Sequence, residues 1–131
     1  MEVVRALAEA FQHRNHEMAF DFYDPEIEWD SSRAVTGAAS GVYHGHEGVR
    51  NYWREWLSAW SDLRFEIDDV RDAGDEVVLL IRDQRQWGRH SGIETDVPPY
   101  GLVFTFRGGK ITRWRAYPDR QSALEAAGLS E

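Results

Sequence analysis

A carboxylate next to an aromatic side chain is the best candidate for chemistry in this sequence. Asp30 directly follows Trp29, at the end of a segment in which Ile27 and Trp29 alternate with acidic residues. In an apolar cleft the charged form of such a carboxylate is disfavoured, which makes it a better proton acceptor. The alternative is a solvated aspartate, or an Asx turn that starts a loop at Ser31 and Ser32. We predict Asp30 as a general base and keep the turn as its alternative.

Aromatic residues form the second group of interest. They make up 13% of the chain and include six Trp. Most are expected in the core, but six Trp are hard to fit into one small core, and Trp is rarely fully buried. We therefore expect part of this group to line a pocket for a small ligand. The candidate substrate-binding residues of this pocket are the aromatic residues Trp29, Trp53, Trp56, Tyr100 and Trp114, together with the apolar Leu102.

Two polar residues complete the candidate site. Arg82 and Gln84 follow the apolar run 77–81 on a predicted strand. If both share the inward face with Val78 and Leu80, they are buried polar groups that need partners, and Asp30 is a candidate partner. The alternative places them on the convex face of the sheet. Arg82 and Gln84 are predicted to bind substrate in the first case and to contact another subunit in the second.

The histidines raise the question of a metal site. His44 and His46 lie two residues apart, with Glu47 adjacent, and His90 is distant in sequence. A metal needs three or more converging ligands, and spacing alone is weak evidence. The simpler interpretation is that His46 and Glu47 open a helix, where an acidic side chain suits the positive end of the helix dipole. We expect no metal and no cofactor.

The composition restricts the function further. The chain has 131 residues, no cysteine and a formal net charge of −8. This charge repels phosphate backbones and anionic membranes, so we expect neither nucleic acid nor membrane as a partner. The absence of cysteine excludes disulfides and is compatible with a reducing compartment. With no signal-peptide pattern at the N-terminus, a cytoplasmic location is expected.

The elements that must position these residues follow from hydrophobic periodicity. Val4, Leu7 and Ala8 have helical spacing, and Asn15 is a predicted N-cap for a short second helix. Segment 31–45 is predicted to be a long loop. Apolar residues over 46–60 recur at helical spacing and predict a helix with an aromatic face.

After this helix the period changes to two, which predicts strands. They cover 63–70, 77–86, 94–106 and 111–117, with a bulge at Asp69 and an interruption at Pro98 and Pro99. Asp119 is a predicted N-cap for a final helix that ends at Gly128. Helices in the N-terminal half therefore cover a curved antiparallel sheet, and a cleft is expected between the two layers.

Several motifs resemble a known group. They are FYDPEIEW at 22–29, YHGHEGVR at 43–50, the segment 104–111 with Trp114, and Asp119 followed by 123–129. Together they cover essentially the whole chain, which resembles the nuclear transport factor 2-like (NTF2-like) superfamily and its SnoaL-like branch. The resemblance implies one α+β domain over residues 1–131, an NTF2-like or cystatin-like cone, and a homodimer through the convex sheet face.

The resemblance also implies several activities, since this superfamily includes ketosteroid isomerases, polyketide cyclases and limonene-epoxide hydrolases beside non-catalytic domains. Asp30 matches the position of the isomerase general base, but Leu102 and Leu7 stand where its hydrogen-bond donors are expected. An epoxide hydrolase needs carboxylates on both sides of an arginine such as Arg82, and Ala116 stands where the second is expected.

The predicted function is binding of a small, mostly apolar, ring-containing carbonyl compound. In its catalytic form Asp30 removes a proton and Arg82 or Gln84 polarises an oxygen, as in an isomerase or cyclase. The alternative is a non-catalytic ligand-binding or dimerisation module, and the third reading is an epoxide hydrolase. Whether the chain is an enzyme stays open at this stage.

Overall fold

The computed structural model describes residues 2–12, 16–33 and 40–130. The chain begins with helix α1 (Glu2–Gln12), the short helix α2 (His16–Ala19) and a 3-10 turn (Phe20–Phe22). Val4, Leu7 and Ala8 of α1 are buried, as their helical spacing predicts. Asn15, the predicted N-cap of the second helix, lies outside the described residues.

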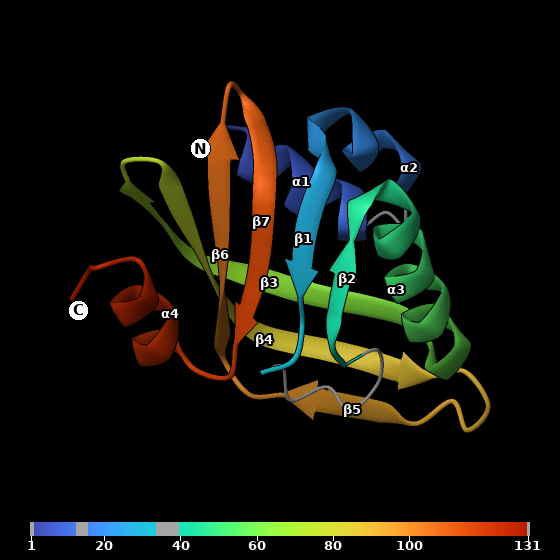
Figure 1. The fold of residues 1–131 in the computed structure, drawn as a ribbon. Helices are drawn as coiled ribbons and strands as arrows, with labels where there is room; N and C mark the ends of the chain where they lie inside the picture. The colour runs from blue at the N-terminus through green and yellow to red at the C-terminus, as the bar shows by residue number, and fades with distance from the viewer. Residues whose placement is uncertain (1, 13–15, 34–39, 131) are drawn as a thin grey trace.

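In the described part of the chain, seven strands form one sheet. They are β1 (Tyr23–Asp30), β2 (Val42–His44), β3 (Trp60–Ala73), β4 (Glu76–Gly88), β5 (Glu94–Val97), β6 (Tyr100–Arg107) and β7 (Lys110–Tyr117). The order is β2-β1-β7-β6-β4-β3, and β5 pairs with the second half of β4. Figure 1 shows β6, β7, β1 and β2 side by side, with β3 and β4 crossing behind them.

Two details of the sheet differ from the sequence prediction. β1 and β7 are parallel, whereas every other pair is antiparallel. The segment 31–45, predicted as loop, ends in β2, which pairs with β1 through Trp29 and Tyr43. The predicted slip of β3 at Asp69 is present as a register shift, and Pro98 and Pro99 separate β5 from β6.

Helix α3 (Gly45–Ala59) carries the aromatic face that the sequence predicts. Val49, Tyr52, Trp53 and Trp56 are buried on it. They occupy positions i, i+3, i+4 and i+7, which lie on one side of an α-helix. The helix ends where Trp60 adopts extended dihedral angles and begins β3.

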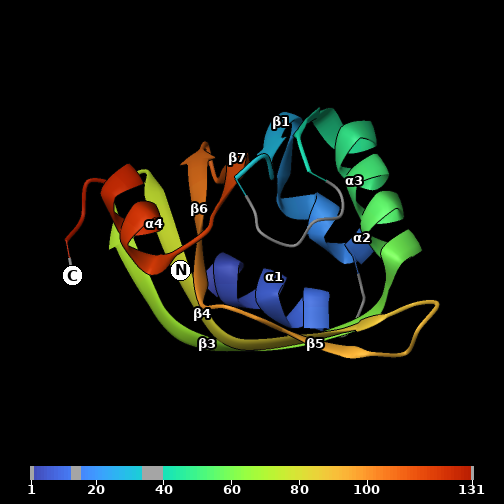
Figure 2. The same cartoon turned by 90° about the horizontal axis from the view of Figure 1, so that it is seen from below.

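The curled sheet has a core on each face. The main core lies inside the curl and combines α1, α3 and the inner face of the sheet, including Leu79 and Ile81. Figure 2 shows α1 inside this curl and helix α4 (Arg120–Ala126) outside it. The smaller core packs α4 against Val78, Leu80 and Val103. The predicted α+β architecture, with helices against a curved, mostly antiparallel sheet, is confirmed.

The N-cap prediction for α4 is also confirmed, because the Asp119 carboxylate accepts a hydrogen bond from the Ser122 amide at 2.7 Å. Gly128, which follows the helix, has a φ of 76°. In the described part of the chain, no helix is long and apolar enough to cross a membrane.

Candidate functional site

A cavity lies inside the curl, between α3 and the sheet. The cavity volume is about 60 Å³, and all the empty space there, open solvent included, measures about 690 Å³. Its lining comes from α3 and five strands. The lining residues are Tyr52, Trp53, Trp56, Leu63, Phe65, Leu79, Ile81, Gln84, Val97, Tyr100, Leu102, Trp114, Ala116 and Tyr117.

Aromatic side chains from α3 form one wall of this cavity. Tyr52 and Trp53 meet at an interplanar angle of 80°, and Trp53 and Trp56 meet at 72°. Trp114 of β7 also lines the cavity and stacks on Trp29, with 4.1 Å between ring centroids. Edge-to-face and offset-stacked rings are the favourable arrangements of aromatic pairs, so this wall is a mutually supported cluster.

A bulge in β4 gives the cavity its polar end. Between Arg82 and Arg85, β4 has two residues where β3 has one, and Asp83 has a φ of 49°. An extra residue reverses the faces of all residues that follow it. Gln84 and Gln86 therefore point inward and are 4% and 1% exposed, whereas Arg82 and Arg85 are exposed.

Gln84, Gln86 and Tyr100 form one chain of hydrogen bonds. The Tyr100 hydroxyl donates to Gln84 Oε1, and Gln84 Nε2 donates to Gln86 Oε1 at 3.0 Å. A buried polar group without a partner costs roughly 1–3 kcal/mol, so these bonds are what makes two buried amides tolerable beside aromatic rings. Gln84 and Tyr100 lie in the cavity lining, and Gln86 supports Gln84 from behind it.

The ionisable side chains in the lining are tyrosines. Burial raises the pKa of Tyr100, as does the neighbouring Tyr52, although the hydrogen bond with Gln84 acts in the opposite direction. Burial also raises the pKa of Tyr52. Both phenols therefore stay protonated at neutral pH. The described residues that line the cavity include no Asp, Glu, His, Lys or Arg, so the cavity offers hydrogen bonds and aromatic faces but no strong base.

Asp30 lies outside this lining. Its Oδ1 accepts from the Ser32 amide at 2.9 Å, and its Oδ2 accepts from Arg33 Nη1 at 2.9 Å. This is the Asx turn that the sequence left as the alternative. Burial raises the pKa of Asp30, but the bonds from Ser32 and Arg33 outweigh it and hold the pKa below its ordinary value. The carboxylate is a weaker base than predicted, because its charge is paired.

Arg82 also lies outside the cavity, on the outer face of the sheet. It pairs with Glu66 at 3.3 Å, with Asp68 at 3.7 Å and with Asp83 at 3.9 Å. Carboxylates do converge on this arginine, as epoxide hydrolysis would require. They do so in an exposed cluster, with half of the Arg82 side chain accessible to solvent. In the cavity lining, Ala116 stands where the second carboxylate of an epoxide hydrolase is expected.

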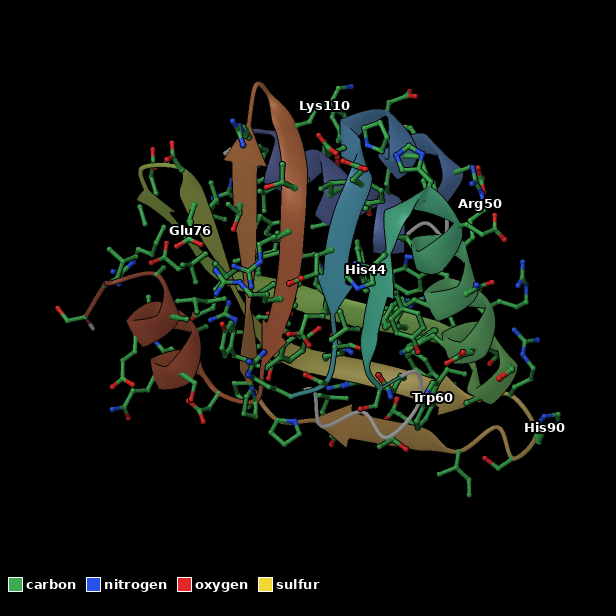
Figure 3. The ribbon with its side chains drawn as sticks, viewed as in Figure 1. His44, Arg50, Trp60, Glu76, His90 and Lys110 are labelled. Atoms are coloured by element: carbon green, nitrogen blue, oxygen red, sulfur yellow. The ribbon has the colours of Figure 1, made fainter. Side chains whose placement is uncertain are left out.

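The histidines are not brought together. Figure 3 shows His44 on β2 and His90 at the far end of β4, well apart. His46 Nε2 lies 3.1 Å from the Tyr23 carbonyl oxygen, and its ring packs against Phe20. Within residues 2–12, 16–33 and 40–130, no three His, Cys, Asp or Glu side chains form a group that could hold a metal ion.

The structure thus brings together six of the predicted site residues at the cavity: Trp53, Trp56, Gln84, Tyr100, Leu102 and Trp114. Asp30 and Arg82 lie outside it, and Trp29 supports it from behind through its stack on Trp114. The sequence prediction missed the other eight lining residues, among them the aromatic residues Tyr52, Phe65 and Tyr117. Tyr52 lies on the same helical face as Trp53 and Trp56, and that spacing was a usable signal.

Comparison with known proteins places the fold. An NTF2-like protein of unknown function from Burkholderia pseudomallei is 22% identical, with a TM-score of 0.77, over 98% of this chain and 95% of that chain. TerC, co-crystallised with polyporic acid, is 20% identical, with a TM-score of 0.75, over 96% of this chain and 95% of that chain.

A third solved structure is a hypothetical protein with a ketosteroid isomerase-like fold from Catenulispora acidiphila, in complex with trimethylamine. It is 19% identical, with a TM-score of 0.73, over 98% of this chain and 94% of that chain. A search of curated proteins finds no match. The family profile described as the SnoaL-like domain matches residues 4–114. The chain therefore belongs to the SnoaL-like domain family and has the NTF2-like fold.

Proposed function

We propose that this domain binds a small, mostly apolar, ring-containing organic molecule in the aromatic cavity and acts as a ligand-binding module. The observation that carries the proposal is the chemistry of the lining. Seven aromatic side chains and a buried glutamine surround a space that opens to solvent, and the described lining holds no charged side chain. Ligand sites are commonly apolar clefts with a few placed polar groups.

The size of the cavity fits partial enclosure of the ligand. The cavity volume, about 60 Å³, is well below the roughly 150 Å³ of an engineered cavity that takes up benzene. A ring therefore extends out of the cavity toward solvent. Two structures of this fold carry small organic molecules, polyporic acid and trimethylamine, which supports a ligand role for the cavity.

Acid–base catalysis with Asp30 as the base receives no support from the geometry. The carboxylate is held in a turn outside the cavity. Tyr100 and Gln84 can donate hydrogen bonds to a ligand oxygen, but a phenol with a raised pKa does not remove a proton from carbon at neutral pH. The binding module is therefore favoured over the isomerase or cyclase.

The test is a thermal-shift screen with cyclic ketones, aromatic polyketide mimics, terpenoid epoxides and steroids. Ligand at about 100 times its Kd adds roughly 2.7 kcal/mol to the free energy of unfolding, so a real ligand shifts Tm by several degrees. Ala116→Leu adds three carbon atoms inside the cavity and should abolish the shift. Asp30→Asn is the matched control outside the cavity and should keep it.

The catalytic reading is tested in parallel by α-proton exchange of any ketone that binds. We expect no exchange above that of Asp30→Asn. Exchange that requires Asp30 would replace the binding module with the isomerase reading, and a thermal shift that persists in Ala116→Leu would remove the cavity as the site.

A further inference from the structure

The hydrogen-bond chain at the polar end of the cavity has a direction. The Tyr100 hydroxyl has one proton, and it donates that proton to Gln84 Oε1. Its oxygen can then only accept further hydrogen bonds. Gln84 Nε2 has two N–H groups, and one of them goes to Gln86 Oε1. The second N–H group of Gln84 takes no part in this series of hydrogen bonds and can only donate.

Charged ligands do not match this end of the cavity. At this end of the cavity the lining offers the Gln84 amide and the Tyr100 phenol, and burial keeps the phenol protonated by raising the pKa of Tyr100. Moving an ionised group into an apolar site without a charged partner is far more costly than moving a neutral polar group. The net charge of −8 additionally repels anions.

From this we infer that the cavity selects an uncharged ring that carries a hydrogen-bond donor and an acceptor side by side, as a cyclic amide (lactam) does. The ring N–H donates to the Tyr100 oxygen, and the ring carbonyl accepts from the second N–H of Gln84. The ring plane lies among the aromatic side chains of α3 and Trp114. This inference rests on the proposed ligand-binding function and names the ligand class of the same site.

Gln86 is the last member of this hydrogen-bond chain and the partner of the Gln84 amide. Because Gln84 Nε2 donates to Gln86 Oε1, the Gln84 amide is oriented with its oxygen toward Tyr100. Gln86 is 1% exposed and therefore cannot exchange this bond for one to bulk water at low cost. Gln86 is a positioning residue, whereas Gln84 and Tyr100 are the proposed contacts.

The experiment compares 2-pyridone with 1-methyl-2-pyridone. The two rings share the carbonyl, but the methyl group removes the N–H donor. Titration into nitrogen-15-labelled protein follows the indole N–H signals of the cavity tryptophans and gives a Kd for each compound. We expect 2-pyridone to bind about tenfold more tightly, which corresponds to one buried hydrogen bond. Toluene, which lacks polar groups, serves as the probe for the cavity itself.

A matched pair of variants locates the contact. Tyr100→Phe removes the acceptor and should equalise the two pyridones. Tyr43→Phe is the control, since the Tyr43 hydroxyl donates to Glu55 at 2.7 Å on the exposed side of α3, and it should leave the tenfold difference intact. If Tyr100→Phe does not fold, the comparison of the two compounds on the natural protein still tests whether the cavity prefers a ring with an N–H donor.

Two results would overturn the inference while leaving the binding function in place. One is equal binding of the two pyridones, and the other is tighter binding of the methylated compound, because in both cases the ring N–H makes no favourable hydrogen bond in the cavity. If neither pyridone nor toluene moves any cavity signal, the proposed function fails together with the inference.

Discussion

At the residue scale, Asp30 is held by its neighbours in sequence. Its two carboxylate oxygens accept hydrogen bonds from Ser32 and Arg33, and the residue is 7% exposed. The chain leaves β1 at this point, and the turn orders its first residues. Ser31 adds a backbone bond of 2.8 Å to the Gly41 carbonyl, which closes the segment before β2 begins. Asp30 therefore has a structural role at the end of β1.

Asp30→Asn is expected to lower the free energy of unfolding by about 1 kcal/mol at neutral pH, because hydrogen bonds to a charged group become neutral ones. The pKa of Asp30 is lowered by folding, so its ionised form stabilises the protein above the unfolded-state pKa of about 3.9. This contribution is lost as the pH falls through the folded-state pKa. Urea denaturation of both proteins at neutral and acid pH measures it, and an equal difference at both pH values would contradict the account.

At the scale of elements, the bulge in β4 determines the composition of the cavity. If the same sequence formed a regular strand without the bulge, the alternation of Leu79 and Ile81 would continue inward to Asp83 and Arg85. Two charged groups would then face the aromatic wall, at a high desolvation cost. The bulge sends Arg85 outward and puts Gln84 in the cavity lining. The bulge thus gives the cavity neutral polar groups where a regular strand would give charged ones.

Asp83 is the place to test the bulge, because its φ of 49° is rare for residues other than glycine. Asp83→Gly should keep the bulge and raise the free energy of unfolding by up to about 1 kcal/mol. Asp83→Val should cost roughly 1–3 kcal/mol and weaken ligand binding, because a β-branched residue opposes this conformation. Urea denaturation and the ligand-induced thermal shift measure both effects, and equal stability of the two variants would argue against a strained bulge.

At the scale of the whole molecule, the sheet is covered on both faces. α1 and α3 occupy the inside of the curl, and α4 occupies part of the outside over β6 (Figure 2). The close approach of α4 depends on Gly101, since a Cβ there would lie 2.4 Å from the Ala123 Cβ. The homodimer through the outer face stays a prediction. Because α4 covers part of this face, such an interface would use the uncovered charged region around Arg82 and Glu66.

Gly101→Ala should lower the free energy of unfolding by about 1–3 kcal/mol, because the added methyl group displaces α4 from the sheet. The same substitution in an Ala123→Gly background should cost much less, since the clashing methyl group is gone. Thermal denaturation of the four proteins gives this coupling as a double-mutant cycle. Equal costs in both backgrounds would show that the contact does not limit the packing of α4.

The sequence by itself determined the elements whose signal is local. The aromatic face of α3 follows from helical spacing, the strands follow from alternation, and the start of α4 follows from a single capping aspartate. Together with the motifs at 22–29 and 43–50, these local patterns were sufficient for the fold and its family. They also located five aromatic or apolar lining residues, because such residues on inward faces converge once the sheet curls.

Only the tertiary structure decided which polar residues enter the cavity. The face of a strand residue depends on register, and one bulged residue reverses it for every residue that follows. This reversal separated Gln84, which is buried, from Arg82, which is exposed, although the sequence treated them as a pair. The basicity of Asp30 also depends on the tertiary structure, because its hydrogen bonds with Ser32 and Arg33 outweigh the effect of burial on its pKa. Periodicity cannot show these choices, since they depend on pairing between strands and on contacts of side chains.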